Sequence, residues 1–207
     1  MKTYTTFTPS HKILYENYFL QSLPSELELC VVEDENQYCK SASFYETGWS
    51  KTCYKKVELF LQACQENMGK TFFYSDVDVQ FFGNVAEDLI EELGDCDIAC
   101  QNDIGNYCSG IIVCKGNNTT LRMFELMKAN YEKEDQHTLN NFIHLCNHKA
   151  LSRKFFTFGH ISQRAWSGEN FDIPDDILMH HANWVLGVEN KMRIMDMVRE
   201  KYEQRNI

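Results

Sequence analysis

The sequence predicts a single α/β domain in which a mixed, mainly parallel sheet is flanked by helices. Its 207 residues fit one domain of ordinary or slightly large size. Short apolar or alternating runs take turns with helical patterns along the chain, which is typical of a sheet covered by helices. The chain has only three prolines and no Gly/Ser-rich tract that would mark a linker. We therefore assign residues 1–207 to one domain.

The predicted strands are short runs that are either continuously apolar or alternate between apolar and polar residues. Continuous apolar runs are expected in strands that are buried on both faces of a sheet. The predicted strands span residues 3–8, 28–32, 71–75, 97–100, 110–114, 155–158 and 177–181.

Helical patterns separate these strands, and several begin after a Ser, Thr or Asn that can cap the first turn. The predicted helices span residues 10–23, 50–67, 119–131, 137–148 and 190–204. The last of them ends in charged residues, which is typical of a solvated helix. It is also compatible with a domain that forms the N-terminal part of a longer polypeptide.

The composition argues against several classes of function. A formal charge of −10 disfavours nucleic-acid binding, which needs clustered Lys and Arg. No run approaches the roughly 20 apolar residues that cross a bilayer, and the N-terminus lacks the apolar block of a secretory signal. We therefore expect a soluble, cytoplasmic protein without membrane insertion. The nine cysteines are scattered through apolar runs, which indicates reduced core thiols.

The most informative segment is residues 71–82, where an apolar run leads directly into Asp76 and Asp78. Carboxylates two positions apart share one face of an extended chain. Ligands bind at the carboxyl ends of strands in open α/β sheets, so this pair is placed to hold a divalent cation and a diphosphate. An ordinary acidic turn is the alternative. Asp95 and Asp97 have the same spacing but precede their apolar run, and we interpret them as a solvated strand entrance.

Three further segments follow this motif in a fixed order. They are Cys-Ser-Gly-Ile-Ile-Val at 108–113, Glu-Asp-Gln-His-Thr-Leu-Asn at 134–140 and His-Ala-Asn-Trp-Val-Leu-Gly-Val-Glu-Asn-Lys at 181–191. Together with Phe-Tyr-Ser-Asp-Val-Asp-Val at 73–79, the set resembles the nucleotide-diphosphate-sugar transferases with the GT-A fold, including the N-terminal transferase domain of a large chlorella-virus enzyme. The resemblance covers most of the chain and implies a GT-A-like (Rossmann-like) domain.

The resemblance also implies a metal site that uses Mn²⁺ or Mg²⁺. In this family the second acid of the motif ligates the ion, and the first reaches the ribose or a metal-bound water, which assigns Asp78 and Asp76 to these roles. A closing histidine completes the site. His181 stands at the family's offsets from the later glycine and lysine, and the adjacent His180 is the alternative. An imidazole ligand suits Mn²⁺ better than Mg²⁺.

Further residues are implied to bind a UDP-sugar donor. Lys191 would neutralise the diphosphate, and the amide of Gly187 can approach it because no side chain intervenes. Thr8 stands where the family holds the base, although it can equally serve as a helix cap. Lys56 resembles the basic residue of the helix before the Asp-x-Asp strand, with a solvated helix surface as the alternative.

The remaining residues surround the sugar. Ser109, Gly110 and Asp103 are implied to border it, while Asp135 and Gln136 face the reacting carbon or the acceptor. If the anomeric configuration is inverted, Asp135 can act as the base for the acceptor hydroxyl. If it is retained, the departing phosphate assists and the Asp135–Gln136 pair steadies the sugar. Related families favour retention.

The implied function is metal-dependent transfer of a sugar, of the hexosyltransferase type, to an acceptor hydroxyl on a glycan. One alternative is a haloacid-dehalogenase-type phosphatase, with Asp76 as nucleophile and Asp78 as acid. Another is a non-catalytic module that binds the sugar nucleotide. His144 and His148, four positions apart on a predicted helix, are a weak candidate metal pair, because no Glu follows the first histidine.

Overall fold

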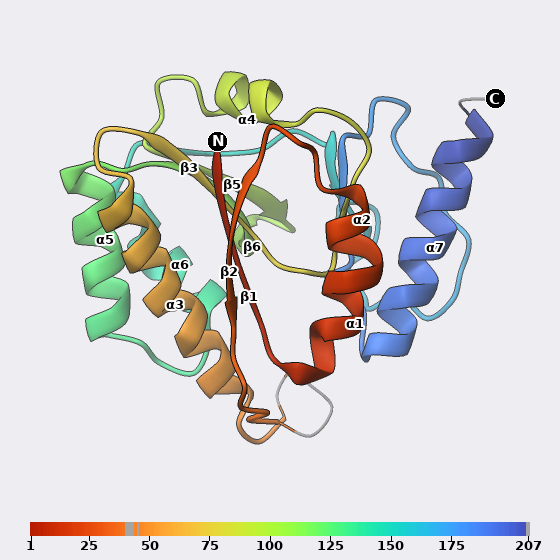
Figure 1. Cartoon of the computed structure of the whole chain (residues 1–207), viewed down its shortest axis with the longest axis horizontal. Helices are drawn as coiled ribbons and strands as arrows, with labels where there is room; N and C mark the ends of the chain where they lie inside the picture. The colour runs from red at the N-terminus through yellow and green to blue at the C-terminus, as the bar shows by residue number, and fades with distance from the viewer. Residues whose placement is uncertain (40–43, 45, 206–207) are drawn as a thin grey trace.

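The structure is a computed structural model that describes residues 1–39, 44 and 46–205. Its centre is a six-stranded sheet in the order β2-β1-β3-β6-β5-β7 (Figure 1). The strands are β1 (Lys2–Phe7), β2 (Glu28–Glu33), β3 (Thr71–Ser75), β5 (Ile98–Asp103), β6 (Asn106–Lys115) and β7 (His148–Ala150). Every neighbouring pair is parallel except the two that include β6. The mixed, mainly parallel sheet is therefore confirmed.

Strand β6 runs against the others because a tight turn joins it directly to β5. Ile104 and Gly105 both have positive φ, 49° and 83°, as in the two-residue turns that twist correctly for a hairpin. The antiparallel direction places the start of β6 at the same edge of the sheet as the ends of β1 and β3. The sequence predicted strands at 97–100 and 110–114 but not their connection, because Ile-Gly lacks the usual Asn or Asp at the first turn position.

A second, three-stranded sheet lies beside the first in the order β4-β9-β8. It contains β4 (Val79–Phe81), β8 (Phe155–Thr157) and β9 (Met179–His181). The runs predicted at 155–158 and 177–181 are therefore strands, but they do not extend the central sheet. Strand β4 was not predicted, because it is short and follows β3 almost directly.

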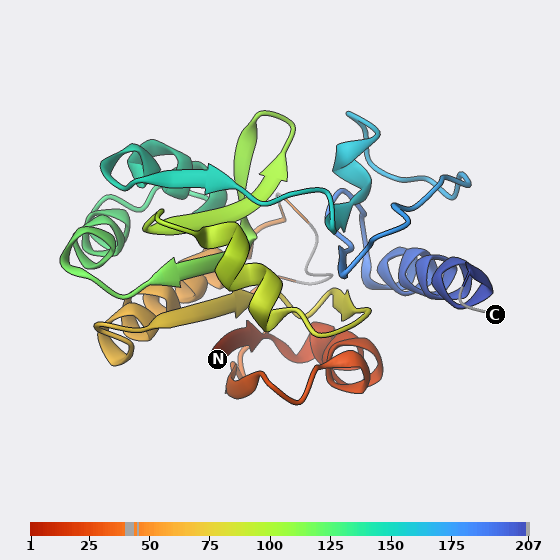
Figure 2. The same ribbon diagram turned by 90° about the horizontal axis from the view of Figure 1, so that it is seen from above.

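Helices cover the central sheet on both faces (Figures 1 and 2). One face packs against α3 (Trp49–Glu66), α5 (Asn118–Ala129) and α6 (Asp135–Phe142). The other packs against α4 (Ala86–Leu93) and the small sheet. The N-terminal helical segment combines α1 (Lys12–Leu14), a π-helical turn (Tyr15–Phe19) and α2 (Leu20–Ser22), and it packs against α7 (Val188–Arg205).

Aromatic side chains of strand β3 pack against the layers on both faces of the sheet. Phe72 and Tyr74 point to the α3 side, whereas Phe73 points to the α4 side. All three are nearly fully buried, and burying an aromatic or aliphatic side chain of this size stabilises the fold by about 1.5–3 kcal/mol. The strand that leads to Asp76 is therefore fixed from both sides.

The helix predicted at 137–148 differs from the observed one at both ends. Helix α6 starts at Asp135 and stops at Phe142, and a 3₁₀ turn covers Ile143–Leu145. His148 belongs to β7, where it pairs with Ile98. The interpretation of His144 and His148 as neighbours on one helix face is therefore wrong, since sheet pairing takes the second histidine out of the helix.

Two other expectations concern the rest of the chain. Cys64, Cys100, Cys114 and Cys146 are buried, reduced thiols in the core beside α3 and α5. Among the helices that the structure describes, none combines the length and the apolar character needed to cross a bilayer.

Candidate active site

The predicted site residues converge on one cavity of about 520 Å³ at the edge where β1 and β3 end. All of them except His180 line this cavity: Thr8, Lys56, Asp76, Asp78, Asp103, Ser109, Gly110, Asp135, Gln136, His181, Gly187 and Lys191. They come from both sheets and from α3, α6 and α7. Tertiary structure thus joins segments that are distant in the sequence.

Asp76 and Asp78 lie in the short connection between β3 and β4, just beyond the end of the strand. The backbone N–H of Asp76 donates to the carbonyl of Gly110 at 2.8 Å, and the N–H of Ala182 donates to the carbonyl of Asp78 at 2.8 Å. The acids are thereby tied to the middle of β6 and to the residue after β9. Asp78 is only 4% exposed, so its carboxylate depends on partners inside the protein.

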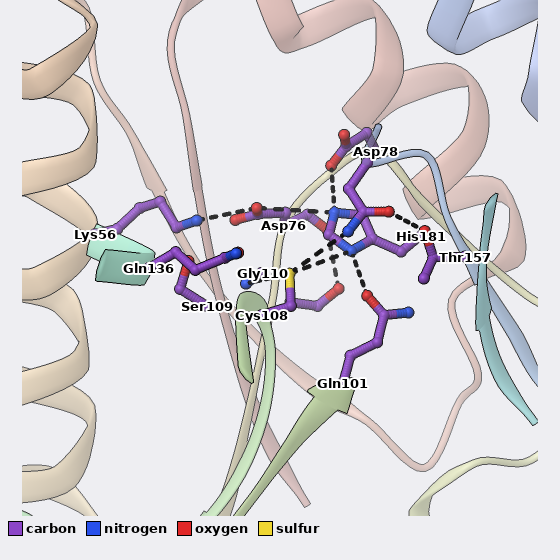
Figure 3. A network of polar contacts seen from close by, with 12 residues as sticks. Lys56, Asp76, Asp78, Gln101, Cys108, Ser109, Gly110, Gln136, Thr157 and His181 are labelled. Carbon is purple, nitrogen blue, oxygen red and sulfur yellow. Dashed lines mark hydrogen bonds and ion pairs between the residues drawn. The ribbon is translucent and has the colours of Figure 1, made fainter. Parts of the chain in front are cut away.

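His181 faces both carboxylates from β9 (Figure 3). Its Nε2 lies 3.4 Å from Asp78 Oδ1 and 4.0 Å from Asp76 Oδ2. One ligand atom from each of the three residues lies within 4.8 Å of the other two. Two carboxylates and an imidazole at this separation can hold one divalent cation.

The surroundings of this cluster fit a metal ion. Nδ1 of His181 lies 2.8 Å from Oε1 of Gln101, which leaves Nε2 for a ligand. A Cβ atom on Gly110 would lie 2.7 Å from Asp76 Oδ2 and 2.5 Å from His181 Cε1. Glycine at this position therefore keeps the space between the two residues open.

Lys191 reaches the same cluster from α7. Its Nζ lies 2.5 Å from Asp78 Oδ2, on the carboxylate oxygen opposite the one that faces His181. Burial by itself would raise the pKa of Asp78, but the Lys191 ammonium outweighs it, together with His181 when that ring is protonated, and this pKa is held well below the usual range. Asp78 is therefore a carboxylate at neutral pH.

Lys56 joins the cluster to a second buried acid. Its Nζ lies 3.0 Å from Asp76 Oδ2 and 2.7 Å from Asp135 Oδ2, and Asp135 also accepts from the Ser109 hydroxyl at 2.7 Å. Burial would raise the pKa of Asp135, but Lys56 dominates and lowers it. The hydroxyl of Tyr74 donates to Asp76 Oδ1 at 2.7 Å. A continuous polar network thus runs from Tyr74 to Ser109.

A third buried acid, Asp103, also lines the cavity. It accepts hydrogen bonds from Gln136 Nε2 at 2.6 Å and from the indole Nε1 of Trp184. A Cβ atom on Gly159 would lie 2.7 Å from two atoms of the Trp184 ring. Glycine at this position therefore lets the indole reach the acid.

His180 lies outside this cavity, although it is next to His181 in sequence. It is fully buried, and neither ring nitrogen has a hydrogen-bond partner among the described residues. Burial and the neighbouring His181 lower its pKa to about 3. The alternation of side chains along β9 directs the two histidines to opposite faces, so His181 is the one that meets the acids.

The cavity also includes residues that follow the first strand. Thr8 is buried there; its side chain makes no cap hydrogen bond to the backbone of the next turn, and its Oγ1 lies 3.4 Å from Ser10 Oγ. Asp34 and His11 line the cavity as well, and burial together with Lys191 lowers the pKa of His11 to about 4. Gly187 has a positive φ of 80° at the start of α7, a conformation that glycine adopts without strain.

Sequence reasoning missed several of these residues. Gln101, Asp34 and His11 stand in no recognised motif; Asp34 and His11 line the cavity, whereas Gln101 contacts His181 from behind it. Tyr74 belongs to the apolar run and to the Asp-x-Asp motif, but neither pattern indicates its hydrogen bond to Asp76. Trp184 belonged to the closing segment, but nothing in the sequence indicated Asp103 as its partner.

A family model described as nucleotide-diphospho-sugar transferase matches residues 19–195. This match spans most of the chain and includes both acids and His181. The chain belongs to this transferase family. No curated protein sequence matches the chain.

Solved glycosyltransferase structures share the fold of this nucleotide-diphospho-sugar transferase. GlyE of Streptococcus pneumoniae TIGR4 is 14% identical with a TM-score of 0.56; the match covers 98% of this chain, which spans only 63% of GlyE. The galactosyltransferase LgtC, with donor and acceptor sugar analogues, is 12% identical with a TM-score of 0.56, over 97% of this chain and 96% of LgtC.

A third solved structure is a glycosyltransferase involved in glycosylation of the major capsid of PBCV-1. It is 12% identical with a TM-score of 0.61, over 95% of this chain and 98% of its own. At such low identities the likeness concerns the fold. It confirms that this nucleotide-diphospho-sugar transferase has the GT-A fold that the sequence motifs implied.

Proposed function

We propose that this chain is a metal-dependent glycosyltransferase domain that moves a sugar from a UDP-sugar to an acceptor hydroxyl on a glycan. The observation that carries the proposal is the cluster of Asp76, Asp78 and His181 in a cavity that Lys191 also lines. A cation and a lysine in one cavity suit a pyrophosphate, whose charge both can neutralise.

Asp78 and His181 would hold the ion, and Asp76 would complete the set or reach the ribose. The imidazole ligand favours Mn²⁺ over Mg²⁺, since Mg²⁺ prefers oxygen ligands. When bound, the ion supplies positive charge that stabilises the departing nucleoside diphosphate. The chain's own residues bind and orient the donor around it.

Lys191 and the amide of Gly187 are assigned to the diphosphate, and Thr8 to the nucleoside end. The Thr8 hydroxyl makes no cap bond to the backbone of the next turn and only a long contact, 3.4 Å, with Ser10 Oγ, which supports this role. Lys56, together with the wall formed by Asp103, Ser109 and Gly110, is assigned to the sugar side. These assignments follow the resemblance of the motifs to the transferase family.

The partners of Asp135 support transfer with retention of configuration. A general base must be able to take a proton from the acceptor hydroxyl. Asp135 is held by Lys56 and Ser109, and its pKa is lowered, so it is a weak base. We therefore assign Asp135 and Gln136 to steadying the sugar and its developing charge, while the departing phosphate assists the acceptor.

The test is calorimetric titration of the protein with UDP and with GDP, each with and without Mn²⁺. We expect UDP to bind only when Mn²⁺ is present, and Asp78→Asn to abolish that dependence. The matched control is Asp95→Asn, which alters the exposed acid of the second Asp-x-Asp and should change nothing. Unchanged metal-dependent binding in Asp78→Asn would overturn the proposal.

Donor turnover separates the alternatives. Incubation with UDP-hexoses and Mn²⁺ should release UDP slowly, and faster once an acceptor glycan is added. Binding without any release would identify a sugar-nucleotide-binding module. Covalent labelling of Asp76 by a phosphate donor would instead identify a phosphatase.

A further inference from the structure

Gln101 is a buried glutamine on β5 that links the two sheets behind the cavity (Figure 3). Its Nε2 donates to the carbonyl oxygens of Phe155 at 2.9 Å and Phe156 at 3.3 Å on β8. Its Oε1 lies 2.8 Å from Nδ1 of His181 on β9. Both ends of the amide are therefore used, one by each strand of the small sheet.

The two carbonyls determine which way the amide faces. A carbonyl oxygen only accepts hydrogen bonds, so it must meet the NH₂ group of Gln101 and not its oxygen. The oxygen then faces His181, and the ring must donate from Nδ1. A neutral ring with its proton on Nδ1 carries its lone pair on Nε2, the nitrogen 3.4 Å from Asp78 Oδ1.

An irregularity in the central sheet accompanies this contact. Cys100 pairs with Ile112, whereas Asn102 pairs with Tyr107. Residues 108–111 of β6 therefore lie opposite the single residue Gln101, which has no register partner in β6. Bulges of this kind are common beside active sites, where they redirect side chains.

We infer that Gln101 is a positioning residue that fixes the orientation and the tautomer of His181, so that Nε2 faces the two carboxylates and can ligate a cation. An amide is required at this position. A carboxylate would accept from His181 equally well, but its second oxygen would meet two carbonyls without a hydrogen to donate. The metal part of this inference rests on the proposed function, whereas the tautomer part does not.

The tautomer is measured by NMR on ¹⁵N-histidine-labelled protein in EDTA, with the His181 signals assigned by their loss in His181→Asn. We expect the wild type to carry the proton on Nδ1. In Gln101→Met the ring loses its oxygen acceptor, and Nδ1 keeps only the weak sulfur contact with Cys108 at 4.0 Å, so the proton should move to Nε2, where Asp78 can accept it. The matched control is Gln80→Met, which removes a second buried glutamine whose register partner is His180.

Metal binding is measured with Mn²⁺ alone, by the electron paramagnetic resonance signal of the free ion. Gln101→Met and Gln101→Glu should bind Mn²⁺ about 10–100-fold more weakly than Gln80→Met, as expected when the outer partner of a ligand is lost. Equal Mn²⁺ affinity, or an Nε2 proton in the wild type, overturns the inference. The wild-type tautomer decides the question even if the Gln101 variants do not fold.

The two proposals fail in different ways. A wild-type protein that binds no Mn²⁺ but keeps its proton on Nδ1 refutes the metal role and with it the proposed function, while Gln101 still orients His181. A wild-type protein that binds Mn²⁺ with the Nε2 tautomer refutes only the role of Gln101.

Discussion

Replacing Gly110 with alanine should weaken metal binding while the fold persists. The φ angle of Gly110 is not in the left-handed region, so the backbone accepts alanine. The added Cβ would lie 2.5 Å from His181 Cε1 and 2.7 Å from Asp76 Oδ2. Since carbon atoms pack at about 3.5–4.0 Å, the ring or the carboxylate must move by about 1 Å.

A shift of this size is large for a metal site and small for a fold. Ligand distances must be right to about 0.2 Å, so we expect Mn²⁺ affinity to fall at least about tenfold, as when the support of a ligand is lost. Crowding a packed region costs about 1–3 kcal/mol of the free energy of unfolding. A domain of ordinary stability, about 5–15 kcal/mol, remains folded after such a loss.

The assay combines Mn²⁺ titration by electron paramagnetic resonance with urea unfolding in EDTA. Gly83→Ala is the matched control, because its Cβ would lie 3.8 Å from Leu178 Cδ2, an ordinary contact. We expect the control to bind Mn²⁺ as the wild type does. If Gly110→Ala binds Mn²⁺ as tightly as Gly83→Ala, the cluster of Asp76 and His181 is not the metal site.

Two further predictions concern charge. Lys191→Met frees one oxygen of Asp78, so Mn²⁺ alone should bind more tightly. UDP in the presence of Mn²⁺ should bind about tenfold more weakly, because one charged contact is lost. Calorimetry should show neither change in the cavity-lining control Lys55→Met, and a loss of both affinities in Lys191→Met would contradict the reasoning. Because the pKa of His180 falls from about 6.5 in the unfolded chain to about 3 in the fold, its contribution to stability is present at neutral pH. This contribution is lost as the pH drops below about 6.5, by about 1.4 kcal/mol per pH unit. Between about pH 7 and pH 4.5, urea unfolding should therefore show a smaller loss of stability for His180→Leu than for the wild type. Equal losses would show that His180 titrates normally.

Local sequence patterns predicted most of the secondary structure. The predicted run at 71–75 coincides with β3, because a strand buried on both faces has a distinctive composition. The helix predicted at 50–67 lies within one residue of α3 at each end. The elements that were missed are short, and the patterns of α4 and β4 extend over too few residues to stand out from the surrounding chain.

The site likewise combines features that local sequence patterns indicate with features that they do not. The spacing of Asp76 and Asp78 after an apolar strand indicates a ligand site, since strand periodicity and the position of strand ends are local properties. The choice of His181 over His180 is not local. It depends on which face of β9 meets the cavity, and β9 belongs to a sheet that the sequence did not reveal.

By itself, the sequence determined the alternation of strands and helices, the buried strand that ends in two acids, and the motifs of the transferase family. Tertiary structure alone decided the partners of those acids. His181 meets Gln101 across 80 positions, and Lys191 meets Asp78 across 113. Hydrophobic periodicity specifies which face of an element is buried, but strand order and the antiparallel turn into β6 decide which polar side chains meet at the edge of the sheet.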